Sequence, residues 1–180
     1  MRWLTFAILA VVLLTLQSTV APWFEVFRAR PDWLLVTVVF LALYARAGDA
    51  VIASWVIGVC ADLMTIERFG FLAVSYALAA LLVILVREYL QRYRIRTQFV
   101  VTLAVCLLLQ TAWMVYRRSA YRPTASIPAD WLGGSVFTSV YTAAWAPLIH
   151  KALLGFSRPL GIVHRRYRYS RPRAMGDAHV

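Results

Sequence analysis

The fold is decided by residues 33–64, which read WLLVTVVFLALYARAGDAVIASWVIGVCADLM. The only charges near the middle of this run are Arg46 and Asp49. A single helix would place both charges in hydrocarbon and would be much longer than the about 20 residues that cross a bilayer. The run therefore predicts a hairpin of two short membrane helices, with Gly48 at the turn and both charges in water. The two helices are expected over residues 31–46 and 49–64.

Apolar runs continue on both sides of this hairpin. They cover residues 3–20, 69–86, 99–115 and 132–154. Each is close to the length of one crossing, and Pro147 is expected to bend the last. The first run could also be a signal peptide, but its length and Pro22, directly after the possible cleavage site, favour a retained helix. Six crossings are expected, or five if the hairpin only enters the membrane. Trp55 and Trp145 fall inside these segments and are expected to be packed.

The composition also indicates a membrane protein. The chain has 180 residues, of which 62% are hydrophobic and 15% are charged, and its mean hydropathy is +0.68. Soluble domains are about 45–50% apolar and about 25% charged. An ordinary water-soluble enzyme, a disordered chain and a coiled coil are therefore excluded. Cys60 and Cys106 lie inside apolar runs without metal spacing, so we expect no disulfide, no metal site and no cofactor.

Basic residues predict the orientation, because cytoplasmic loops of membrane proteins carry an excess of Lys and Arg. With six crossings, the side that holds both termini carries most of the 19 basic residues, so both termini are expected in the cytoplasm. The helical domain is expected over residues 1–155 and a basic tail over residues 156–180. This tail would lie on anionic lipid or dock an acidic partner, and no nucleic acid is expected. Its charges include Arg165, Arg166, Arg168, Arg171 and Arg173.

Small residues at four-residue spacing mark one face of the helix expected over residues 49–64. The face holds Ala50, Ser54, Gly58 and Asp62, and the next helix carries Gly70, Ala73, Ala77 and Ala80 on a similar face. Small residues let membrane helices approach closely, so we expect these two helices to pack together. The alternative is that Ala and Gly are simply common in membrane helices.

Two carboxylates near helix ends are the most informative polar groups. A carboxylate such as Asp62 at the edge of the hydrocarbon costs about 1–3 kcal/mol unless it is paired or hydrated. Asp62 is therefore expected either to contact a partner or an ion, or to pair with Arg68 or an arginine of residues 27–32. Asp32 follows Pro31 and is expected to cap the next helix.

No catalytic set is visible. Asp49 and Asp62 are the residue type that intramembrane aspartyl proteases use, but about 20 Å of helix separates them. A two-carboxylate site is therefore not expected. The histidines, His150, His164 and His179, are scattered. We expect no enzyme activity.

Short segments, in their order along the first half of the chain, resemble the family of the rod shape-determining protein MreD. They are Leu16-Gln17-Ser18-Thr19, Arg30-Pro31-Asp32 before an apolar helix, Gly58-x-x-x-Asp62-Leu63, and Gly70. The resemblance implies a non-catalytic scaffold subunit of the bacterial cell-elongation and peptidoglycan synthesis machinery, in the cytoplasmic membrane. Its implied direct partner is MreC, and its indirect partners are MreB, RodA and a penicillin-binding transpeptidase. The implied fold is similar to the substrate-binding subunits of energy-coupling-factor transporters.

Two functions remain open at this point. A scaffold would use a small-residue face and helix ends for partner binding or helix packing, through Asp32, Ser54, Gly58, Asp62 and Gly70. A small-solute permease subunit of the vitamin-transporter kind would need a polar cavity, for which the candidates are Gln17, Gln110, Thr111 and Thr138.

Overall fold

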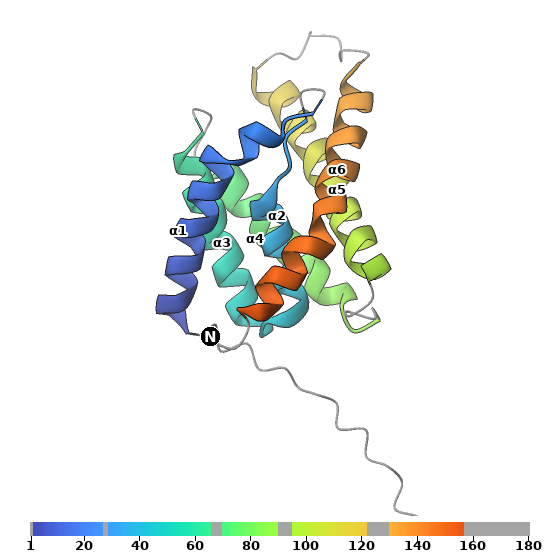
Figure 1. Ribbon diagram of the computed structural model, residues 1–180. Coiled ribbons are helices and arrows are strands. Elements are labelled where there is room, and N and C mark those ends of the chain that lie inside the picture. The colour runs from blue at the N-terminus through green and yellow to red at the C-terminus, as the bar shows by residue number, and fades with distance from the viewer. Residues whose placement is uncertain (1, 27–28, 66–69, 90–94, 122–129, 157–180) are drawn as a thin grey trace, which may run out of the picture.

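Six α-helices and one short 3-10 helix make up the described part of the chain (Figure 1). The computed structural model describes residues 2–26, 29–65, 70–89, 95–121 and 130–156. The elements are α1 (Trp3–Thr19), η1 (Ala21–Phe24), α2 (Trp33–Tyr44), α3 (Ala47–Leu63), α4 (Phe71–Val86), α5 (Ile95–Tyr121) and α6 (Asp130–Gly155). The all-α prediction is therefore confirmed for these ranges. The five tail arginines lie outside them.

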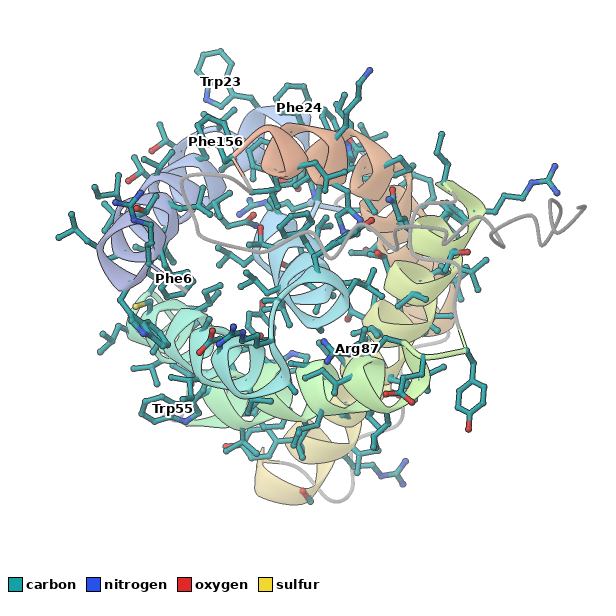
Figure 2. The ribbon with its side chains drawn as sticks, turned by 90° about the horizontal axis from the view of Figure 1, so that it is seen from below. Phe6, Trp23, Phe24, Trp55, Arg87 and Phe156 are labelled. Atoms are coloured by element: carbon teal, nitrogen blue, oxygen red, sulfur yellow. The ribbon has the colours of Figure 1, made fainter. Side chains whose placement is uncertain are left out.

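The centre of the bundle is α2, which contacts each of the other five α-helices. Figure 2 shows it enclosed by them when the bundle is seen from below. Every residue from Trp33 to Leu43 is buried. A helix that is apolar all round is stable only inside a larger structure or in lipid. Its polar exception, Thr37, donates its hydroxyl hydrogen bond to the Trp33 carbonyl within the same helix (2.9 Å).

The outward surface of the bundle is apolar as well. Large exposed side chains include Leu4, Val11, Ile52, Leu63, Leu82, Leu85, Val100 and Leu148. Apolar surface of this extent marks contact with lipid or with another protein. By length and hydropathy, residues 95–116 of α5 are able to cross a membrane, whereas α1, α2 and α4 are shorter apolar helices. Six crossings stay a prediction.

The break between α2 and α3 differs from the expected turn. Gly48 lies in the first turn of α3, and the chain reverses at Ala45 and Arg46 instead. Arg87, at the end of α4, stabilises this break, because its Nη1 donates to the carbonyl oxygens of Ala42 (3.0 Å) and Ala45 (2.8 Å). These bonds satisfy acceptors that the end of α2 leaves without partners inside the helix.

Two tryptophans expected to be packed have different environments. Trp145 is half-buried, and its ring lies 5.9 Å from that of Trp33 and 5.2 Å from that of Phe24. Trp55 is 51% exposed and points outward from α3 (Figure 2), so its prediction was wrong. In an apolar membrane helix, the buried face and the outer face have similar residues. The position of a residue along the segment therefore does not predict on which face it lies.

Candidate functional site

The carboxylate of Asp62, in the last turn of α3, caps the start of α4. Its Oδ2 accepts hydrogen bonds from the backbone N–H groups of Gly70 (3.0 Å) and Ala73 (2.9 Å), and its Oδ1 accepts one from Leu72 (3.1 Å). The side chain is only 5% exposed. The first N–H groups of a helix have no partner inside the helix and carry partial positive charge, so a buried carboxylate is stable there.

Backbone amides therefore satisfy this carboxylate in the described part of the chain. The expected partner Arg68 lies outside the described residues. Gly70 is the N-cap of α4 and has φ +105°, a left-handed conformation that glycine adopts at little cost. This geometry brings its N–H to the Asp62 carboxylate.

One turn before Asp62, Gly58 lets the backbones of α3 and α4 approach each other. A Cβ atom at Gly58 would lie 2.5 Å from the Cα atom of Ala73 and 2.7 Å from the carbonyl oxygen of Leu72. The other small residues of this face, Ala50 and Ser54, are fully buried. The structure thus places the expected stripe inside the bundle, with Gly58 and Asp62 against α4.

Asp32 joins the start of α2 to α4 and α6. Its Oδ1 accepts a hydrogen bond from the backbone N–H of Leu35 (2.9 Å), which confirms the predicted cap of α2. Its Oδ2 accepts the hydroxyl hydrogen bond of Tyr76 on α4 (3.0 Å), and its own N–H donates to the hydroxyl of Thr142 on α6 (3.3 Å). These contacts connect α2, α4 and α6 at one point.

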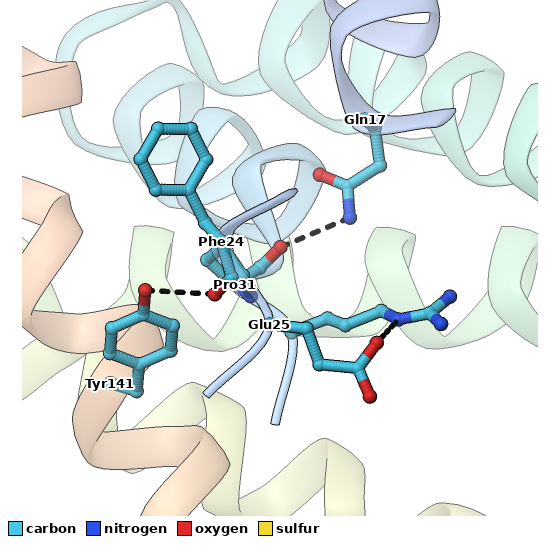
Figure 3. A network of polar contacts seen from close by, with 6 residues as sticks. Gln17, Phe24, Glu25, Pro31 and Tyr141 are labelled. Atoms are coloured by element: carbon cyan, nitrogen blue, oxygen red, sulfur yellow. Dashed lines mark hydrogen bonds and ion pairs between the residues drawn. The ribbon is translucent and has the colours of Figure 1, made fainter. Parts of the chain in front are cut away.

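The segment between α1 and α2 is held from both sides (Figure 3). Gln17 of α1 donates from Nε2 to the Pro31 carbonyl (3.1 Å) and accepts at Oε1 from the Trp33 N–H (2.9 Å). From α6, the Tyr141 hydroxyl donates to the Phe24 carbonyl (2.9 Å). Gln17 therefore joins α1 to the start of α2, and both its amide nitrogen and its amide oxygen are used in these bonds.

Two of the other candidates for a solute cavity, Thr111 and Thr138, bond within their own helices. The Thr111 hydroxyl donates to the carbonyls of Leu107 and Leu108, and the Thr138 hydroxyl donates to that of Gly134. Thr111 is exposed and Thr138 is half-buried. These contacts give no support to a polar solute site. Within the described ranges, no group of three or more His, Cys, Asp or Glu side chains is arranged to hold a metal ion.

Sequence reasoning missed Tyr76, Thr142 and Arg87 as members of these networks. Tyr76 and Thr142 stand inside otherwise apolar segments, and a buried hydroxyl in such a segment needs a partner. The sequence therefore indicates that these hydroxyls have hydrogen-bond partners, but it does not indicate which helix supplies them.

The family model of the rod shape-determining protein MreD matches residues 1–122, which is more than half of the chain. The chain belongs to the MreD family. The predicted resemblance is confirmed, and the match reaches beyond the first half of the chain to the end of α5. No curated protein and no solved structure shows a significant match, so the implied likeness to energy-coupling-factor transporter subunits is not confirmed.

Membership places the chain in a bacterial membrane protein family with a role in rod-shape determination. MreD is a shape-determining family and is not known as an enzyme family. The matched residues include both capping carboxylates, Asp32 and Asp62, and the close contact at Gly58. The site in this MreD-family chain is therefore a set of helix-joining contacts.

Proposed function

We propose that this chain is a non-catalytic scaffold of the cell-elongation machinery and that it binds MreC in the cytoplasmic membrane. One observation carries the proposal: the polar side chains of the candidate site bond to helix ends of the same chain. Asp62 caps α4, Asp32 caps α2, and Gln17 joins α1 to α2. Such contacts make a rigid bundle and leave an apolar outer surface, which suits a subunit that holds other membrane proteins in place.

The same proposal includes the indirect partners and the topology. Through MreC, the chain would be connected to MreB, RodA and a penicillin-binding transpeptidase. The six α-helices would each cross the membrane, with both termini and the basic tail in the cytoplasm, where the tail would meet anionic lipid.

Cysteine labelling tests the topology. Glu25 and Arg46 are exposed residues that flank α2. We expect a membrane-impermeant thiol reagent to label the Glu25→Cys variant in intact cells, and the Arg46→Cys variant only after the membrane is opened. The unsubstituted chain, with Cys60 and Cys106, gives the background. Labelling of both variants from one side would contradict the crossing by α2.

Purification from native membranes tests the scaffold. An affinity-tagged full chain is expected to carry MreC in a stable ratio, and depletion of the chain is expected to turn rod-shaped cells round. If the purified chain carried a stoichiometric vitamin-like solute and no MreC, and its depletion left cell shape unchanged, a permease subunit would replace the scaffold.

A further inference from the structure

An apolar groove separates α1 from α6, which lie on the same side of the bundle (Figure 1). In the described residues α1 packs on α2 and α3, whereas its backbone does not come close to that of α6. The groove between them has a volume of about 690 Å³. Side chains from Thr5 to Leu16 form one wall, those from Trp145 to Phe156 form the other, and Trp33 adds to the lining.

The lining favours a flexible chain over a helix as the occupant. Membrane helices approach each other through small residues, because these let the backbones come close. Both walls consist mainly of large aliphatic and aromatic side chains, and Thr5 and Ala152 are the small exceptions. Inside a membrane, a space lined in this way is filled by hydrocarbon.

The length of the groove corresponds to one leaflet. Eleven helical steps from Thr5 to Leu16 rise about 17 Å, and the hydrocarbon core of a bilayer is about 30 Å thick, so one leaflet provides about half of that. One acyl chain therefore suits the groove from end to end.

Positive charge marks the end of the groove near Thr5 and Phe156. Arg2 lies three residues before Thr5, Lys151 is the neighbour of Ala152, and both are exposed. We propose that the groove holds one acyl chain of an anionic phospholipid, whose phosphate lies between Arg2 and Lys151. The site depends on the membrane location of the family and is independent of MreC binding.

Native mass spectrometry of the full chain in detergent tests this site, with phosphatidylglycerol as the anionic probe and phosphatidylcholine as the neutral one. We expect one phosphatidylglycerol per chain. The Ala152→Trp variant fills part of the groove and is expected to bind phosphatidylglycerol about tenfold more weakly. This is the loss in affinity expected when about two methylene groups of the acyl chain are no longer buried. Ala144 is also exposed on α6 but does not line the groove, so Ala144→Trp is expected to bind as the unsubstituted chain does.

A variant with both Arg2→Ser and Lys151→Ser tests the headgroup contact, and it is expected to lose the preference for phosphatidylglycerol over phosphatidylcholine. Equal lipid binding by the Ala152→Trp and Ala144→Trp variants would overturn the site. An unchanged preference for phosphatidylglycerol in the double variant would also overturn it.

A photoreactive residue at position 148 tests whether the groove holds lipid or protein. If this residue captured a protein in place of lipid, the groove would be assigned to a partner helix, and the proposal would be overturned. MreC co-purification is a separate readout, so failure of the lipid site leaves the scaffold proposal standing.

Discussion

Replacing Gly58 by alanine is expected to destabilise the bundle, and replacing it by leucine is expected to prevent folding and to give round cells. A Cβ atom at Gly58 would lie 2.5 Å from the Cα of Ala73 and 2.9 Å from its backbone nitrogen. Overpacking against movable side chains costs about 1–3 kcal/mol. Here the obstacles are backbone atoms, so α3 and α4 must move apart. The measurement is the thermal unfolding midpoint of the purified chain, together with the cell shape of a complemented depletion strain.

Gly48 offers a matched control in the same helix. It lies in the first turn of α3, and a Cβ atom there would meet nothing within 4 Å. Alanine is favoured over glycine in helices by about 1 kcal/mol. Gly48→Ala is therefore expected to leave the unfolding midpoint unchanged or raise it, whereas Gly58→Ala lowers it. If both substitutions shifted the midpoint in the same direction and by the same amount, the close approach of α3 and α4 would not be a source of stability.

Replacing Asp62 by asparagine is the second change with a large expected effect. In the native chain, both carboxylate oxygens of Asp62 accept hydrogen bonds from backbone N–H groups of α4 and its N-cap. Asparagine keeps only one acceptor oxygen and replaces the other with an NH₂ group, which is a donor and cannot accept from a backbone N–H. Each buried donor left without a partner costs about 1–3 kcal/mol. Loss of the negative charge at the start of α4 adds to this. We expect a much lower unfolding midpoint and faster proteolysis near the start of α4.

Glu25→Gln is the control for the change from carboxylate to amide. Glu25 pairs with Arg30 at 2.6 Å, and the two side chains are 31% and 61% exposed. Exposed ion pairs contribute about 0–1 kcal/mol, so a small shift is expected. Equal shifts for Asp62→Asn and Glu25→Gln would show that the cap of α4 does not hold the bundle together.

The helices themselves could be predicted from local pattern. The observed bounds of α1 and α4 agree closely with the predicted segments, because both helices are apolar runs with clear ends. The end of α2 could not be predicted, since Arg87 from the far end of α4 caps its last carbonyls. α5 begins at Ile95, before the predicted apolar run, because polar residues continue the helix beyond the apolar stretch.

The candidate site was predicted in part. Spacing alone put Gly58 and Asp62 on one helix face, and the structure places that face against α4. The bonding partner of Asp62 could not be predicted in the same way. A charged side chain has a sequence signature, whereas a backbone N–H belongs to every residue except proline and has none.

By itself the sequence determined an all-helical apolar chain of the MreD family, a small-residue face and two carboxylates that had to find partners. Those properties follow from residue type and spacing along one helix. Only the tertiary structure decided that Asp62 caps α4, that Asp32 joins three helices, and that a groove separates α1 from α6. The physical reason is that these contacts depend on which helix ends meet in space, and apolar helices with similar surfaces leave that choice to the packing of the whole bundle.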